Sequence, residues 1–355
     1  MQRMYAALAT IALCLLAGPT AAVAISPADD PPITFRSDVS LGRVDAQVVD
    51  GGNRSIRGLR VEDFILRVDG KPQEIRNFQS EKVPADVVLL LDVSRSMEPH
   101  IRRVATASHQ ALRALGDNDR IATVVFDRFT RLRMPFRVSR LDAERELESV
   151  LDRESFDGGT DITRGLLDTA SYVERNARRD ARRAIVIVTD DQTERSRNET
   201  AVLRALTRAD SVLSALIAPD ALHTGAAYQR QPSLDDDRQR DILSDLFPRG
   251  FGSYSRYPRT QSAGTSQIAS QSGGDSMAVD QAAAFEQTLE RIRERYALYF
   301  YLPDGMRPGE EHSVEVLVTD AARRRFPGSE VRYRRSYLGP NGVNDTERPR
   351  PIRLM

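Results

Sequence analysis

The sequence predicts an α/β protein: a doubly wound, mostly parallel sheet with flanking helices, inserted in a small β-sandwich formed by the N- and C-terminal flanks. Three observations lead to this prediction. Between residues 84 and 295, wholly apolar runs alternate with amphipathic stretches of helical length. On both sides, at 34–82 and 296–338, shorter stretches alternate apolar and polar residues as half-buried strands do. Neither flank is long enough to bury a core alone, so we expect the two flanks to pair.

The first 24 residues have the features of a secretory signal peptide. Arg3 gives a positive start, residues 6–18 are almost wholly apolar, and Ala22-Val23-Ala24 has the small-x-small pattern that signal peptidase reads. Because the apolar run is shorter than the ~20 residues that cross a bilayer, we prefer a cleaved signal to a membrane anchor. We therefore expect an exported protein, periplasmic or secreted, with no transmembrane segment after cleavage behind Ala24.

Cysteine and charge content exclude several classes of site and partner. The only cysteine, Cys14, lies in the predicted signal peptide, so the mature chain has no thiol for disulfides, thiolate zinc sites or nucleophilic catalysis. Lys+Arg and Asp+Glu are both 51, which leaves no overall basic field to attract nucleic acid. Residues 339–355, which include alternating arginines and prolines, are predicted to be a flexible tail.

The flanks are predicted to supply the strands of the sandwich. Alternating stretches that indicate strands occur at 44–48, 64–68, 298–301 and 313–318. Gly51-Gly52 and Asp69-Gly70 mark turns in the first flank, and a turn is expected near 303–305 in the second. Two separate β appendages are the alternative, which we consider weaker because neither would bury enough apolar surface.

The central region, 84–295, has the alternation of a parallel α/β sheet. Continuous apolar runs, typical of strands buried on both faces, lie at 87–91, 121–126, 184–188 and 212–217. Helical patterns lie at 101–115, 142–151, 162–173, 199–208 and 283–295. The stretch 131–136 follows the second run so closely that it is predicted to be an antiparallel edge strand.

A polar insertion of about residues 220–264 interrupts this alternation. It is longer than an ordinary connection and contains Asp235-Asp236-Asp237 and several tyrosines and arginines. Because it follows the fourth parallel strand, it is expected at the carboxyl edge of the sheet. There its tyrosines and arginines would suit an interface.

Three polar motifs also fall at that carboxyl edge, where ligands of open α/β sheets bind. Asp92-x-Ser94-x-Ser96 follows the first apolar run, Gly158-Gly159-Thr160 precedes a helix, and Thr189-Asp190 ends the third run. Each alone could be a helix cap. Their occurrence together at one edge is harder to explain by capping and favours a ligand site.

These motifs resemble the metal-ion-dependent adhesion site of von Willebrand factor type A (VWFA) domains, and the resemblance covers about residues 86–296. The stretches 59–64, 69–75 and 294–299 extend it to the exported bacterial (Acidobacteria-type) VWFA-related domain family. The resemblance implies a vWA/Rossmann-like fold and metal ligands at five positions. These positions are Asp92, Ser94, Ser96, Thr160 and Asp190.

The implied cofactor is Mg²⁺, with Mn²⁺ and Ca²⁺ as alternatives, because hydroxyl and carboxylate oxygens are hard donors. In the family, an Asp or Glu of a partner protein completes the coordination of the metal. The sequence departs from the family at Asp191, where glycine is usual. An extra carboxylate there would either tighten cation binding or repel an acidic ligand. Family behaviour also implies that ligand binding moves the last helix, 283–295, with a rigid junction as the alternative.

We therefore expect an exported metal-dependent binding or adhesion module that captures an acidic group of a partner protein. A structural envelope protein with a stabilising metal is one alternative. A Mg²⁺-dependent hydrolase is a weaker one, because only Asp161 and Asp191 could act as its base and no catalytic set is evident. The remaining candidates, the scattered histidines, show no metal-ligand spacing. They are His100, His109, His223 and His312.

Overall fold

The computed structural model confirms the predicted α/β class. It describes residues 41–79, 83–218, 260–281, 283–303, 306–307 and 309–339. The predicted signal peptide with Cys14, most of the polar insertion and the tail from residue 340 lie outside the described residues. Within the described part of the chain, no helix is long and apolar enough to cross a membrane.

A six-stranded sheet forms the centre of the α/β region, in the order β12-β10-β8-β5-β6-β7. Its strands are β5 (Ala85–Asp92), β6 (Arg120–Phe126), β7 (Thr130–Arg137), β8 (Arg182–Thr189), β10 (Ser211–Ile217) and β12 (Ser276–Ala278). All neighbours are parallel except β6 and β7, so the antiparallel edge strand was correctly predicted. Along the chain, β5 is followed by β6, its neighbour on one side in the sheet, and later by β8, its neighbour on the other side. This reversal places a switch point between β5 and β8.

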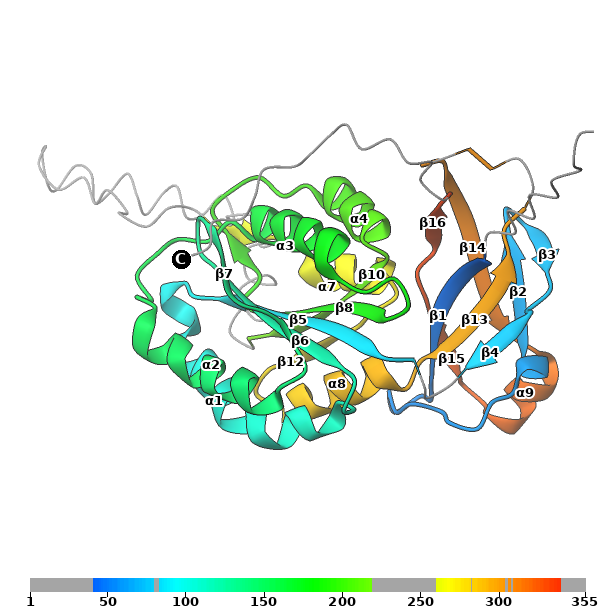
Figure 1. Ribbon diagram of the computed structural model, residues 1–355, viewed down its shortest axis with the longest axis horizontal. Coiled ribbons are helices and arrows are strands. Elements are labelled where there is room, and N and C mark those ends of the chain that lie inside the picture. Colours follow the sequence, from blue (N-terminus) through cyan, green and yellow to red (C-terminus); the bar gives the residue numbers. More distant parts are fainter. Residues whose placement is uncertain are drawn as a thin grey trace, which may run out of the picture. The chain divides into compact units, whose positions relative to one another are not determined.

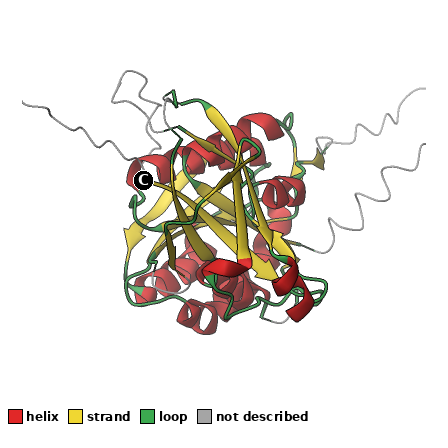
Figure 2. Cartoon of the chain, turned by 90° about the vertical axis from the view of Figure 1, so that its right-hand side faces the viewer, coloured by secondary structure: helices red, strands yellow, loops and turns green. Residues whose placement is uncertain are grey.

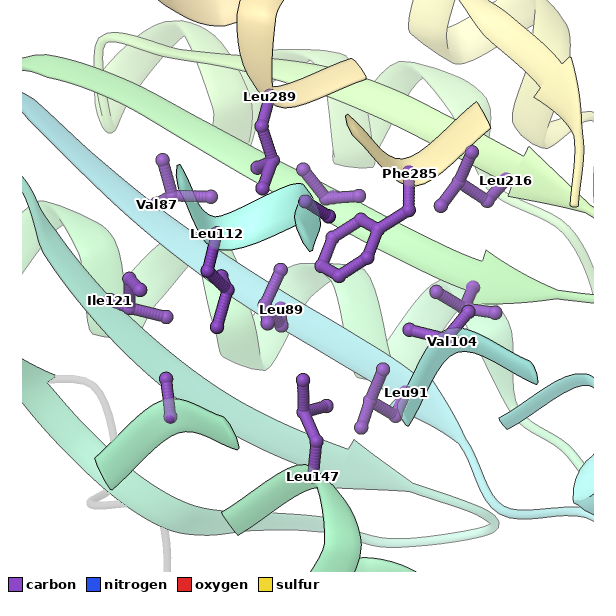
Figure 3. Packing of buried hydrophobic residues seen from close by; sticks show 14 of the residues in the cluster. Val87, Leu89, Leu91, Val104, Leu112, Ile121, Leu147, Leu216, Phe285 and Leu289 are labelled. Carbon is purple, nitrogen blue, oxygen red and sulfur yellow. The ribbon is translucent and has the colours of Figure 1, made fainter. Parts of the chain in front are cut away.

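Within the described residues, six helices pack on this sheet, three on each face. Figure 1 shows the helices on the two sides of the sheet. One face carries α1 (Glu98–Ala111), α2 (Arg140–Arg153) and α8 (Ala284–Arg293); the other carries α3 (Ile162–Asn176), α4 (Glu199–Arg208) and α7 (Thr265–Gln271). Side chains of β5 alternate between two cores: Val87, Leu89 and Leu91 join the first cluster, drawn in Figure 3, and Val88 and Leu90 join the second. This alternation explains why the strand is apolar from Val87 to Leu91.

Two antiparallel four-stranded sheets flank the α/β region, and Figure 2 views their strands face on. The first, in the order β15-β1-β13-β4, contains β15 (Glu330–Arg332), β1 (Leu41–Val49), β13 (Tyr296–Tyr301) and β4 (Asn77–Gln79). The second, β16-β14-β2-β3, contains β16 (Ser336–Leu338), β14 (Glu311–Val318), β2 (Phe64–Val68) and β3 (Lys71–Gln73). Both sheets mix strands from before and after the α/β region and share one hydrophobic core.

Buried arginines join this sandwich to the amino ends of the parallel strands. Arg182, the first residue of β8, donates hydrogen bonds to the backbone oxygens of Arg293 and Arg295, just where α8 ends and β13 begins. Arg295 donates to Gly273 O at 2.7 Å, and Arg43 of β1 donates to Ala181 O at 2.7 Å. The junction therefore lies at the end of the sheet opposite the predicted ligand edge.

Several short elements were not predicted from the sequence: α7, β12, the helix α9 (Asp320–Arg325), the 3₁₀ turns η1 (Val61–Asp63), η2 (Arg95–Met97) and η3 (Leu112–Ala114), and a two-strand ribbon of β9 (Gln192–Thr193) and β11 (Gln261–Ser262). β12 depends on a close approach of two backbones. A Cβ on Gly274 would lie 1.8 Å from Leu213 O, so only glycine fits there. Such tertiary contacts leave no periodic signal in the sequence.

Candidate metal centre

The first motif turns the chain sharply from β5 into α1. Asp92, the last residue of β5, is fully buried, and its Oδ1 accepts a hydrogen bond from Ser94 N at 3.0 Å. Met97 N donates to Ser94 O at 3.0 Å and closes the turn η2, while the Met97 side chain is buried in the core. The turn thus directs Ser94 and Ser96 to the carboxyl edge of the sheet.

The other oxygen of Asp92 is held from the neighbouring strand. Thr189, the last residue of β8, donates from Oγ1 to Asp92 Oδ2 at 2.8 Å, and both side chains are fully buried. Burial raises the pKa of Asp92 to about 7, and the nearby negative charge of Asp190 adds to the rise. The hydrogen bonds from Ser94 and Thr189 oppose it without cancelling it.

The first and third motifs are joined directly. Ser96 Oγ donates to Asp190 Oδ2 at 2.5 Å, and Asp190 Oδ1 accepts from Gln192 N at 3.0 Å. Ser96 is exposed and Asp190 is half-buried, so this pair lies at the surface above the buried Asp92. The β5–β8 switch point therefore brings together two carboxylates from different strands.

The second motif packs against the first and against two further loops. Ser94 and Gly158 form a parallel bridge, and the buried Thr160 accepts at its backbone oxygen from Glu194 N at 2.9 Å. A Cβ on Gly159 would lie 2.2 Å from the Glu194 carboxylate oxygens. The loop at Gly159 therefore passes close to the end of the Glu194 side chain, which would have to move if this residue had a Cβ.

The residues at this edge fit a hard divalent cation. Ser94 Oγ is buried beside the Asp92 carboxylate and makes no hydrogen bond of normal geometry, so a cation would supply a better partner for this polar atom. The buried Asp92 with Asp190 beside it is an unfavourable anionic arrangement that a cation would relieve. Within the described ranges, no three His, Cys, Asp or Glu side chains cluster as a metal site. The donor set would thus be two carboxylates with hydroxyls, which suits Mg²⁺ better than a thiophilic metal.

Asp191 has a structural role that the sequence left open. Its backbone φ is 60°, in the left-handed region that favours glycine. This conformation explains why glycine is usual at this position in the family that the sequence resembles. Its carboxylate accepts hydrogen bonds from Ser262 Oγ at 2.6 Å and from Thr265 N at 2.9 Å, where α7 begins. Both oxygens are thus used to hold the chain after the polar insertion. Nothing near Asp191 in the sequence signals these partners.

Asp161, the other candidate base, caps a helix. Its Oδ1 accepts from Arg164 N at 3.0 Å at the start of α3, the capping role that helix-terminal charge predicts. Of the histidines in the described ranges, His109 lies near Glu144 and His312 near Asp69, far apart along the chain. They do not take part in the site.

Sequence reasoning missed three residues that shape the edge. Asp127, after β6, accepts at its backbone oxygen from Asp161 N at 2.9 Å. Arg128 donates to Glu194 at 3.0 Å, which fixes the carboxylate that packs on Gly159. Arg128 and Glu194 are 66 residues apart in the sequence, so their ion pair gives no recognisable motif.

Comparison with known proteins agrees with the architecture. A family model described as a VWA domain containing CoxE-like protein matches residues 63–236. No curated protein was found to match the sequence.

Three similar solved structures are reported for their fold alone. An aerotolerance-related membrane protein from Bacteroides fragilis is 18% identical, with 59% of this chain and 98% of that chain covered and a TM-score of 0.42. BatB from Bacteroides thetaiotaomicron is 16% identical, with 59% and 96% covered and a TM-score of 0.40. Proximal thread matrix protein 1 of the mussel byssus, with a zinc-occupied MIDAS motif, is 16% identical, with 40% and 39% covered and a TM-score of 0.34.

Proposed function

The chain contains a von Willebrand factor type A domain, and from this premise we propose that the protein is an exported, non-enzymatic binding module. It captures an acidic group of a partner protein through a divalent cation, with Mg²⁺ as the first choice. The proposed ligands are Asp92, Ser94, Ser96, Thr160 and Asp190. The export signal is the N-terminal segment described above from the sequence.

The contact between Ser96 Oγ and Asp190 Oδ2 carries this proposal. It joins two motifs that are far apart in the sequence, directly beside the buried carboxylate of Asp92. Helix capping does not explain it, because neither Ser94 nor Met97, the residues before η2 and α1, makes a side-chain capping bond. The second loop adjoins the first through the bridge between Ser94 and Gly158, which supports a site shared by the three loops.

The proposed ligands would contribute to cation binding in different ways. Asp92 and Asp190 supply negative charge, while the serine and threonine hydroxyls are neutral and leave part of a cation's charge uncompensated. A bound cation would offer that remaining charge to a carboxylate of the partner. Thr189 and Gln192 N hold the two aspartates in place.

Two observations support a binding role over hydrolysis. An enzyme at this edge would need a free base beside the cation, and the candidates were Asp161 and Asp191. Asp161 is engaged in capping α3, and both oxygens of Asp191 accept hydrogen bonds. Neither carboxylate is poised to activate a water molecule.

Calorimetric titration of Mg²⁺ and Mn²⁺ into the metal-stripped mature protein tests the proposal. We expect saturable binding at one site, its loss in Asp92→Ala, and wild-type binding in Asp157→Ala. Asp157 is a suitable control because it is an exposed acid of the same loop as Thr160. Absence of binding in the wild-type protein, or binding retained by Asp92→Ala, would refute the site.

A structural role for the metal is the second candidate, favoured by the burial of Asp92. In that case, removing the metal would lower the melting temperature without changing the capture of acidic peptides. The proposed binding role requires that capture be lost with the metal. Measuring both quantities on the same preparation separates the two roles.

A further inference from the structure

An exposed aromatic side chain lies on a loop beside the candidate metal centre. Phe129, in the turn between β6 and β7, is 62% exposed, more than any other large hydrophobic residue in the described ranges. The turn itself is ordered by hydrogen bonds: Phe129 N donates to Asp127 Oδ1 at 2.7 Å, and Asp127 N donates to Phe129 O at 3.2 Å. The fold therefore holds this ring in solvent on a fixed backbone.

A hydrogen bond and close packing connect this turn to the Thr160 loop. Asp127 O accepts from Asp161 N at 2.9 Å, and the position of a Cβ on Gly158 lies 3.1 Å from the Asp127 Cβ. On the other side of the turn, Arg128 pairs with Glu194, which packs on Gly159. Phe129 is thus attached, through its own turn, to the loop that supplies the proposed ligand Thr160.

The surroundings of the ring are suited to an acidic partner. The guanidinium of Arg164 lies 5.6 Å from the centre of the Phe129 ring, and Arg95 is exposed between the proposed ligands Ser94 and Ser96. The charge of Arg128 is already balanced by Glu194, and Arg164 pairs with Asp168 at 3.5 Å, so the exposed Arg95 supplies the positive charge that is available to a partner. Two arginines and one aromatic ring therefore border the site, with the exposed Asp157 as an opposing charge.

The other exposed large hydrophobic residues lie elsewhere in the described ranges. Val138 and Leu141 follow β7, which runs antiparallel to β6 and so ends at the opposite edge of the sheet. The rest belong to the flanking sheets or their connections: Leu41, Val61, Ile65 and Tyr301. Phe129 alone among them is located where a partner held at the metal would reach it.

We propose that Phe129 is a second contact point for the partner and determines which acidic partners are bound. The partner is a protein segment with an Asp or Glu for the cation and an apolar side chain a few residues away that packs on the Phe129 ring. The exposed Arg95 favours further acidic residues in that segment by charge complementarity. This inference rests on the proposed function of the metal site. Aromatic anchors beside a directional polar contact are common at the centres of protein interfaces.

The test selects short randomised peptides, displayed on phage, on the mature full-length protein in Mg²⁺ and in EDTA. We expect the Mg²⁺-dependent pool to combine an acidic residue with an aromatic or large aliphatic residue at a preferred spacing. A synthetic peptide from that pool should bind Phe129→Ser about tenfold more weakly or worse, the scale expected for losing most of one buried aromatic contact. It should bind Leu141→Ser like the wild type, since Leu141 is 53% exposed but distant from the site.

The outcomes separate the inference from the function on which it rests. Phe129→Ser should keep the wild-type melting temperature and Mg²⁺ affinity, because the ring is exposed and is not a ligand. Acidic peptides without an apolar preference, or equal binding by Phe129→Ser, would overturn the inference and leave the metal-dependent function standing. No Mg²⁺-dependent enrichment, or enrichment that persists in Asp92→Ala, would overturn both.

Discussion

Replacing Thr189 by valine should destabilise the protein and weaken the metal site, although Thr189 is not a proposed ligand. Valine keeps the shape of threonine but removes the Oγ1 that donates to Asp92 Oδ2 at 2.8 Å and accepts from Asp191 N at 3.1 Å. The first loss leaves a fully buried carboxylate oxygen without its donor, a cost of about 1–3 kcal/mol. The second bond adds about 1 kcal/mol. We expect a total loss of roughly 2–4 kcal/mol in the free energy of unfolding.

Thr123→Val is the matched control. Thr123 lies in β6 of the same sheet, is equally buried, and has an Oγ1 without a hydrogen-bond partner. Its replacement should be neutral or slightly stabilising, because valine removes an unsatisfied polar atom. Urea denaturation of both variants measures the difference, and calorimetry with Mg²⁺ should show an affinity about 10–100-fold lower for Thr189→Val. Equal stability of the two variants, with wild-type Mg²⁺ affinity in Thr189→Val, would refute the role assigned to this bond.

Three further predictions concern the rest of the fold. The pKa of Asp86 is lowered because hydrogen bonds from Arg120 and Arg178 outweigh the effect of burial. The contribution of this carboxylate to stability is therefore complete above pH ~4 and is lost as pH falls through the lowered pKa. Replacing Asp86 by asparagine should lower the free energy of unfolding by about 3 kcal/mol at pH 7, and urea denaturation should show a weaker loss of stability at acid pH than in the wild type. Gly274→Ala should lower the melting temperature sharply because its Cβ would meet Leu213 O at 1.8 Å, whereas Gly51→Ala, with no atom within 4 Å, should not. Hydrogen exchange of α8 should be unchanged when Mg²⁺ and a captured acidic peptide are added. Faster or slower exchange across the helix would contradict a rigid junction between α8 and the β-sandwich.

The sequence was sufficient to predict the sheet and its main helices because these elements have strong local patterns. β5 is apolar from Val87 to Leu91 since both of its faces are buried, and α4 was predicted at the bounds that the structure gives. The short elements β12 and α7 depend instead on long-range contacts, including the approach of Gly274 to Leu213 and the capping of α7 by Asp191. No local pattern records such contacts.

The same distinction applies to the site. Asp92, Ser94 and Ser96 form a compact motif from which the sequence predicts them as ligands, and Thr160 and Asp190 are predicted from motifs of their own. The roles of Thr189 and Asp191 emerge only when their partners, up to 97 residues away, are placed beside them. Phe129 carries no motif, and its relevance depends on exposure and position, which only the fold defines.

The junction with the sandwich indicates how binding at the metal edge would relate to the rest of the chain. The sequence allowed either a moving last helix or a rigid connection. Arg182 donates to the backbone oxygens of Arg293 and Arg295, and the guanidinium of the fully buried Arg295 donates to Gly273 O at 2.7 Å. Sliding α8 along its axis would separate these buried charged donors from their acceptors, at a cost of about 1.5–3 kcal/mol for each bond lost. The ~1–3 kcal/mol typical of coupling between sites is too small to break several such bonds together. We therefore expect a rigid connection, and we expect the proposed ligand capture to involve only the loops of the carboxyl edge.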